Sequence, residues 1–384
     1  MRQVYLDNAA TSRPKPAAVQ QAIISYLEDC GCSPGRGGYE GALQAGRILL
    51  ETRDLAARLF NAPSPEQVIF THNITHALNY GIKGLLKPGD HVITSSMEHN
   101  AVIRPLSQLV KYQQVQVSYV NCDTQGQLDP GAIEQEIKAN TKMLIITHAS
   151  NVTGTIMPIH ELSTIARAHN LYLVLDTAQT AGVYELDFAT LQPDILAFTG
   201  HKSLLGPTGT GGFVISERAV SAMEPLITGG TGSMSDKEYQ PDFLPDKFEG
   251  GTPNTMGLAG LMAGISFILD VTPQAIRAHN KELTKHLRDG LTQIQDITVV
   301  GPTNMDYQTS TLSITVDKWD LGELSFLLDE HWGIMTRSGL HCAPLAHRTI
   351  GTYPQGTLRL SLGYFNTAAE VEYTLTALEQ LIKL

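Results

Sequence analysis

The chain has 384 residues, of which 42% are hydrophobic and 17% are charged. A chain of this length can bury a large core, so we expect one large domain with a smaller one, or two domains. The formal net charge of −11 argues against general binding to nucleic acid or to an anionic membrane surface.

Secretion and membrane insertion are not expected either. The first residues, MRQVYLDNAATS, lack a basic region followed by an apolar one, so they do not resemble a signal peptide. No apolar run approaches about 18 residues, the length of a membrane-spanning helix. Four cysteines in so long a chain do not make a disulfide framework. A reducing cytoplasm is the expected location, and there a thiol is available for chemistry.

The predicted elements begin with a helix over residues 16–29. From about residue 65 to 220, short apolar runs then alternate with amphipathic helical patterns such as ITHALNYGIKGLL. The predicted strands are EQVIFT, HVITSS, KMLIITH, LYLVLD, DILAFT and GGFVIS. Repeated strand–helix–strand order predicts an α/β fold with a mainly parallel sheet and helices on its faces.

Polar residues stand where these buried strands end. They are Thr71, Ser95, His148, Asp176 and Thr199. Ligand sites in such sheets lie beyond the carboxyl ends of the strands, so we expect the chemistry there.

The second half of the chain shows a different sequence pattern. The segment 226–257 is rich in Gly, Pro and charge, and a loop this long is usually functional or covers a partner. Alternating strands such as TLSITV and TLRLSL follow, and a capping box from Thr367 to Glu370 opens the last predicted helix. We predict a large α/β domain over 16–264 and a smaller α+β domain formed by 1–15 and 265–384.

Lys202 is the first candidate for chemistry. It lies just past the predicted strand DILAFT, where partial desolvation would lower its pKa and expose a nucleophilic amine. The alternative is an ordinary lysine in a surface turn. The following glycines, GPTGTGG, precede a strand and do not open a helix, so they are a weak match to a dinucleotide loop.

Asp176 is the second candidate, since a carboxylate at the end of a buried strand needs a cation or a ligand. An internal ion pair is the alternative. A lysine and an aspartate at neighbouring strand ends fit pyridoxal phosphate, which needs a Schiff-base lysine and a carboxylate opposite its ring nitrogen. Asn73 can cap a helix whose first turn contains Thr75, and such a helix start can bind a phosphate or be no more than a cap.

Six motifs in chain order resemble those of the class V aminotransferase family of pyridoxal phosphate enzymes. They are LDNAATS, EHN at 98–100, SNVTG at 150–154, DTAQ at 176–179, TGHK at 199–202 and FEGGTPN at 248–254. RSGLHCA, with Arg359 in LRLSLG, is similar to the cysteine desulfurases that carry an R-x-G-H-H-C-A type motif. The resemblance runs from residue 5 to the end and implies the fold of the fold type I pyridoxal phosphate enzymes.

The resemblance also implies how the cofactor is held. Lys202 would carry it as a Schiff base, Asp176 would keep its ring nitrogen protonated, and Gln179 would reach its phenolic oxygen. His99 would stack on the ring as a catalytic residue, with Asn151 beside it.

The phosphate would be held by two sets of groups. Thr75, Thr199 and His201 would bind it from the same subunit. Thr252 would reach the phosphate of the neighbouring subunit, which implies a homodimer.

Substrate chemistry is implied as well. Arg359 would bind the carboxylate of L-cysteine, with Asn151 nearby, because its planar guanidinium suits that task. Cys342 would attack the substrate sulfur and keep it as a persulfide, leaving L-alanine. His341 or the bound substrate would lower the pKa of the Cys342 thiol. The sulfur would pass to an acceptor protein, for iron–sulfur cluster or thio-cofactor assembly.

Three positions depart from the pattern and keep other activities open. Leu340 replaces a histidine, Ile74 replaces a hydroxyl residue, and the sequence GRGG at 35–38 lacks the usual neighbouring histidine. Alternatives are a selenocysteine lyase, a cysteine sulfinate desulfinase, an epimerase or an aminotransferase.

The remaining cysteines and histidines suggest a more distant alternative, a non-catalytic metal or sulfur carrier. Its zinc ligands would be His331, His341, Cys342 and His347, although we expect no metal. Cys30 and Cys32 are expected in a loop, with an auxiliary thiol as the alternative. Cys122 is expected to be structural.

Overall fold

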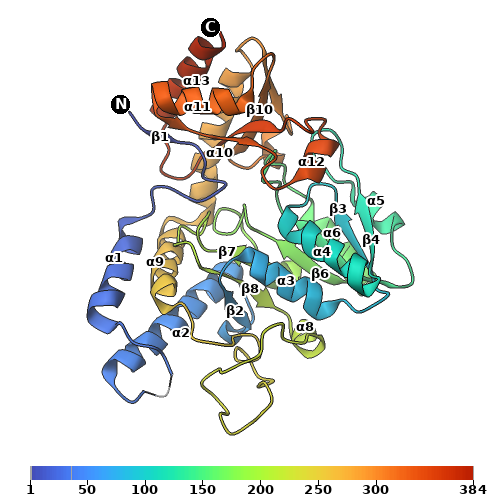
Figure 1. Cartoon of the computed structure of the whole chain (residues 1–384), viewed down its shortest axis with the longest axis vertical. Coiled ribbons are helices and arrows are strands. Elements are labelled where there is room, and N and C mark those ends of the chain that lie inside the picture. The colour runs from blue at the N-terminus through green and yellow to red at the C-terminus, as the bar shows by residue number, and fades with distance from the viewer. Residues whose placement is uncertain (1, 36, 384) are drawn as a thin grey trace.

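A computed structural model describes residues 2–35 and 37–383. Figure 1 shows a larger body built around one sheet, and a smaller body formed by the C-terminal elements together with the N-terminal strand β1. Helix α9 (Thr255–Val271) packs in the larger body, and helix α10 (Pro273–Leu291) runs from it to the smaller one. The predicted boundary at 264/265 falls inside α9, and the division into domains stays a prediction.

Seven strands form the main sheet, in the order β2-β8-β7-β6-β5-β3-β4. Their bounds are β2 Val68–Thr71, β3 His91–Ser95, β4 Gln116–Val120, β5 Thr141–Thr147, β6 Tyr172–Asp176, β7 Ile195–Thr199 and β8 Gly211–Ile215. All neighbours pair in parallel except β8, which is antiparallel to both β2 and β7. The mainly parallel α/β fold predicted from the alternating pattern is therefore confirmed.

Helices cover both faces of this sheet, because its strands are apolar on both sides. Leu196 and Phe198 of β7 join one hydrophobic cluster, while Ile195 and Ala197 join the other. The helices of the larger body are α1 Ala17–Ser25, η1 Tyr26–Cys30, α2 Glu40–Phe60, η2 Pro65–Gln67, α3 Ile74–Leu85, α4 Asn100–Gln113, α5 Pro130–Gln135, α6 Ile159–Ala168, α7 Phe188–Leu191 and α8 Glu217–Ala222. The first predicted helix, 16–29, is α1 followed by one π-helical turn.

The last two glycines of GPTGTGG, Gly211 and Gly212, lie in the tightly packed strand β8. A Cβ atom at Gly212 would lie 2.4 Å from the carbonyl oxygen of Ile69 and 2.6 Å from the ring of Phe198. This packing agrees with the view that GPTGTGG is not a dinucleotide loop.

The smaller body has a four-stranded antiparallel sheet in the order β12-β13-β10-β9 and its own hydrophobic cluster. Its elements are β9 Ile297–Val300, η3 Met305–Tyr307, β10 Thr311–Val316, α11 Leu321–Trp332, β11 Ile334–Met335, β12 Arg337–Gly339, α12 Pro344–Thr349, β13 Thr357–Ser361 and α13 Ala368–Ile382. Thr367 and Glu370 form the expected capping box of α13. Strand β1 (Val4–Tyr5) pairs in parallel with β11, which ties the N-terminal segment to this body.

Among residues 2–35 and 37–383, no single helix is long and apolar enough to cross a membrane. The pair α9 and α10 passes the same criteria of length and composition together, but the two helices meet at an angle of 81°.

Candidate active site

Lys202 and Asp176 lie at the carboxyl edge of the main sheet. Asp176 is the last residue of β6 and is 3% exposed, and Lys202 follows the neighbouring strand β7. Burial lowers the pKa of Lys202 to about 8, an effect that Arg359 and Arg337 reinforce and that Asp176 and Asp7 oppose. The lysine is therefore a better nucleophile at neutral pH than an exposed one.

The pKa of the Asp176 carboxyl is raised overall, although two groups oppose the effect of burial. Burial raises its pKa, while the backbone N–H of Ala178, which donates to Oδ1 at 2.9 Å, and the charge of Lys202 lower it. The mutual effect of Lys202 and Asp176 on their pKa values shows that the two predicted residues are brought together.

His99 caps α4 and is neutral. Burial lowers its pKa to about 4, with Lys202, Arg104 and Arg359 as further causes. Its Nδ1 accepts a hydrogen bond from the backbone N–H of Ala101 at 3.0 Å, so the proton of the neutral ring is on Nε2. Because the charges of Lys202 and Arg359 both lower the pKa of His99, both residues lie close enough to His99 to act on its ring.

The start of α3 lies beside Thr199. Asn73 caps this helix by accepting from the N–H of His76 at 3.0 Å. Thr199 pairs with Gly211, where an added Cβ would lie 2.9 Å from the backbone of Asn73. Thr75 lies in the first turn of α3 and is exposed.

The polar atoms around Lys202 fit pyridoxal phosphate. Thr199 Oγ1 and His201 Nδ1 are buried and have no hydrogen-bond partner among the described residues. Burial lowers the pKa of His201 to about 4. The two unpartnered polar groups and the positive end of α3 match what the phosphate of that cofactor requires. The Lys202–Asp176 pair supplies the amine and the carboxylate that it also requires.

Gln179 and Thr252, two further predicted residues, lie in different places. Gln179 lines a cavity with Lys202 and donates from Nε2 to the carbonyl oxygen of Ala9 at 3.2 Å. Thr252 is exposed and borders another cavity, with His72, His76 and Leu50. Thr252 and Lys202 therefore line two different cavities.

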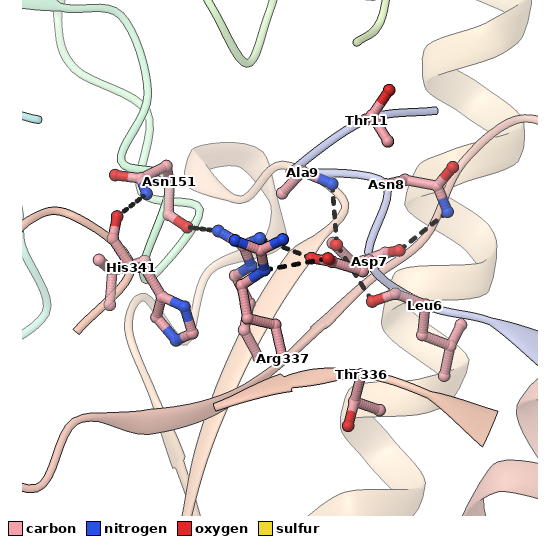
Figure 2. Close-up of polar contacts among 12 residues, drawn as sticks. Leu6, Asp7, Asn8, Ala9, Thr11, Asn151, Thr336, Arg337 and His341 are labelled. Atoms are coloured by element: carbon pink, nitrogen blue, oxygen red, sulfur yellow. Dashed lines mark hydrogen bonds and ion pairs between the residues drawn. The ribbon is translucent and has the colours of Figure 1, made fainter. Parts of the chain in front are cut away.

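Arg359 is 2% exposed and belongs to a polar cluster with Asp7, Asn151 and Arg337. Figure 2 shows these last three residues together with His341. The Nη2 of Arg359 pairs with Asp7 Oδ1 at 2.7 Å and its Nη1 donates to the carbonyl oxygen of Asn151 at 3.0 Å. Arg337, opposite Arg359 in the β12–β13 ladder, pairs through Nε with Asp7 Oδ2 at 3.0 Å. The Nε of Arg359 is buried without a partner among the described residues, and is free to donate to a ligand.

Asp7 was missed as a candidate by sequence reasoning. It stands in the LDNAATS motif, and an acidic residue directly after an apolar strand was a usable signal. The sequence around Asp7 does not indicate its arginine partners, the first of which follows 330 residues later along the chain.

Cys342 is exposed and lines one cavity with Thr75 and His99. It lies in a turn closed by a 2.9 Å hydrogen bond from the N–H of Ala343 to the carbonyl of Leu340. His341 and Cys342 both have positive φ, at 47° and 57°. Such conformations cost about 1–2 kcal/mol per non-glycine residue, so the surroundings must hold this turn in place.

The role expected for His341 beside the Cys342 thiol stays a prediction. Its ring is buried beside Thr357, whose carbonyl lies 3.2 Å from Nε2, and beside the ring of His347. Burial lowers the pKa of His341 to about 3, with the charge of Arg359 as the next cause. The His341 ring is therefore neutral at physiological pH.

The other cysteines lie outside these cavities. Cys30 and Cys32 are half-buried, and their thiols donate to the carbonyl oxygens of Gly41 at 3.2 Å and of Cys30 at 2.8 Å. Cys122 is buried, which raises its pKa to about 12. In the part of the chain that the structure describes, no three His, Cys, Asp or Glu side chains are grouped so as to hold a metal ion.

A lysine and a buried carboxylate at the carboxyl edge of a mainly parallel sheet are typical of pyridoxal phosphate enzymes. The family profile described as aminotransferase class V matches residues 4–374, so the chain belongs to the class V aminotransferase family.

Within this family, the chain is similar to cysteine desulfurases. It is 34% identical over 382 residues to a probable cysteine desulfurase of Methanothermobacter thermautotrophicus, covering 98% of this chain and 94% of that protein. A probable cysteine desulfurase of Pyrococcus abyssi is also 34% identical, over 99% of this chain and 94% of its own length. The apo structure of cysteine desulfurase from Thermococcus onnurineus NA1 superimposes with a TM-score of 0.94 at 32% identity, over 99% of this chain and 95% of that one.

Proposed function

We propose that this protein is a pyridoxal phosphate-dependent cysteine desulfurase, which converts L-cysteine to L-alanine and transfers the sulfur to Cys342. One observation carries the proposal: an exposed thiol, Cys342, lines the same cavity as His99, and His99 is within electrostatic reach of Lys202 and Arg359. The similarity to cysteine desulfurases over nearly the whole chain supports it.

The cofactor would be held by the residues already described. Lys202 would bind its aldehyde carbon, Asp176 its ring nitrogen and Gln179 its phenolic oxygen. Thr75, Thr199 and His201 would bind its phosphate, and His99 would cover its ring. When bound, pyridoxal phosphate withdraws electrons from the Cα of an amino acid.

The chain's own residues supply the remaining chemistry. Arg359 orients the substrate carboxylate, and the Lys202 amine, once freed by the substrate, takes the Cα proton. The Cys342 thiolate attacks the substrate sulfur, so that an S–S bond forms while the substrate C–S bond breaks. The Cβ that loses sulfur gains a proton, and Lys202 returns the proton to Cα, so the products are L-alanine and a persulfide on Cys342.

The wider role of the protein is part of the same proposal. The persulfide sulfur would pass to an acceptor protein for iron–sulfur cluster or thio-cofactor assembly, in the cytoplasm. Thr252 would complete the phosphate site of a neighbouring subunit in a homodimer. Its exposure within one chain supports this arrangement.

The first test concerns the cofactor. Purified protein is expected to be yellow with a band near about 420 nm, and Lys202→Ala should lose that band. Colourless wild-type protein that contains zinc would instead favour a metal carrier.

The second test concerns the thiol. Cys342→Ala should stop the release of alanine from L-cysteine while the cofactor band persists. Unchanged turnover of cysteine in this variant would remove Cys342 from the mechanism. Turnover of L-selenocysteine or L-cysteine sulfinate in preference to L-cysteine by the wild type would instead favour a lyase or a desulfinase.

A further inference from the structure

The turn that carries Cys342 is tied to the rest of the molecule through its two central carbonyl groups. The carbonyl oxygen of His341 accepts a 2.8 Å hydrogen bond from Nδ2 of Asn151. The carbonyl oxygen of Cys342 accepts a 2.8 Å hydrogen bond from the backbone N–H of Asn100. Both donors come from the larger body, whereas the turn follows β12 of the smaller one.

These outside donors matter because the turn is unfavourable by itself. Positive φ at both central positions is a conformation dominated by Gly, Asn and Asp, and here His341 and Cys342 occupy them. A strained backbone persists only where its surroundings over-determine it. Asn151 is 9% exposed, so its hydrogen bond is sheltered from competing water.

Asn151 also contacts the group that receives the substrate carboxylate. Its carbonyl oxygen accepts from Nη1 of Arg359. Its side chain donates to the carbonyl oxygen of His341 and so holds the turn (Figure 2). Arg359 is anchored in turn by Asp7 and keeps its Nε free for a ligand. A carboxylate can therefore bind Arg359 without breaking the chain of contacts from Asp7 through Arg359 and Asn151 to His341.

We propose that Asn151 is a positioning residue for Cys342, which fixes the nucleophile's turn at a set distance from the carboxylate-binding Arg359. This role goes beyond the contact with cofactor or substrate that the family resemblance implies for Asn151. It rests on the proposed function only in taking Cys342 as the nucleophile. Because the substrate's carboxylate and sulfur lie at opposite ends of one small molecule, such a link sets the reach of the thiol.

The first experiment measures amide hydrogen exchange in the holoenzyme without substrate. Asn151→Leu keeps the size of the side chain and removes the hydrogen-bond donor. In this variant the amides of Ala343 and Asn100 should exchange about three- to tenfold faster, because the loss of one ordinary hydrogen bond changes the rate by that factor. The matched control is Gln179→Leu, an amide of the same site that donates to Ala9 and not to the turn. Unchanged exchange in Asn151→Leu would overturn the proposal.

The second experiment separates positioning from a general loss of the site. L-Cysteine and L-cysteine sulfinate carry the same carboxylate, but the sulfinate leaves as SO2 and needs no thiol. The ratio of their kcat values, cysteine over sulfinate, should fall about tenfold in Asn151→Leu and stay constant in Gln179→Leu. An equal loss for both substrates in Asn151→Leu would mean that Asn151 serves only binding or folding, and would overturn the proposal.

A third variant covers the case in which Asn151→Leu does not fold. Arg359→Lys removes the donor to the Asn151 carbonyl and should accelerate the same two amides. Unchanged exchange in that variant would contradict the coupling. If the wild type does not turn over cysteine at all, the proposed function fails while the exchange measurements still decide whether Asn151 holds the turn.

Discussion

At the scale of single residues, burial decides the charge of the groups around Lys202. His99, His201 and His341 all have pKa values lowered to about 4 or below, chiefly by desolvation. These rings are therefore neutral at physiological pH. The positive charge of the site comes from Arg359 and Arg337, which share the carboxylate of Asp7.

Glu98, the neighbour of His99, provides a pH-dependent test of this burial. It is fully buried, accepts from Ser95 Oγ at 2.6 Å and from the N–H of Thr147, and burial raises its pKa to about 8. The folded state thus keeps a proton that the unfolded state releases between pH 4.5 and about 8. Stability should fall as the pH rises through this window.

Glu98→Gln removes that dependence while it keeps an acceptor for Thr147. The free energy of unfolding of the variant, relative to wild type, should rise by about 2–4 kcal/mol between pH 4 and pH 8.5. Denaturant unfolding at several pH values measures it. A difference that stays flat across the window would mean that Glu98 is ionised in the folded protein.

At the scale of elements, β8 is the strand that departs from the parallel order, and its glycines let it pack closely. Gly212→Ala should destabilise the protein by about 1–3 kcal/mol, because the added methyl group meets the Ile69 carbonyl and the Phe198 ring. Gly38→Ala is the matched control, since a Cβ there has no neighbour within 4 Å among the described residues. Thermal unfolding compares the two, and equal stability of both variants would contradict this packing.

At the scale of the whole molecule, one face of the larger body carries exposed apolar side chains. Leu43 and Leu50 on α2 are 48% and 63% exposed, and Leu50 borders the same cavity as Thr252. This arrangement favours a second copy of the chain as the partner of that face.

Leu50→Lys should therefore shift the protein toward the 41.7 kDa monomer and weaken cofactor retention, because the charge disfavours burial of that face. Phe326→Lys, at a similarly exposed position on α11 of the smaller body, is the control. Sedimentation velocity distinguishes the species. A wild type that sediments as a monomer at micromolar concentration would refute the proposed homodimer.

The sequence by itself determined the fold class and the main chemical groups. Apolar runs of β-branched residues alternating with helical periodicity predicted the parallel sheet, since these signals are local. Lys202 and Asp176 could be singled out because they stand at or just past the carboxyl ends of predicted buried strands, where ligand sites lie in such sheets. The family motifs added His99, Arg359 and Cys342, whose roles stay predictions.

Only the tertiary structure decided which of these groups touch and how they are charged. Asp7 meets Arg337 and Arg359 because β1 joins the smaller body and because β12 pairs with β13. The pKa of His341 is lowered chiefly by burial, with the charges of Arg359 and His347 as further causes, and no local pattern indicated this. Contacts between distant segments, and the burial that they cause, set the pKa values and hold the strained turns. These properties therefore follow from packing and not from the order of residues alone.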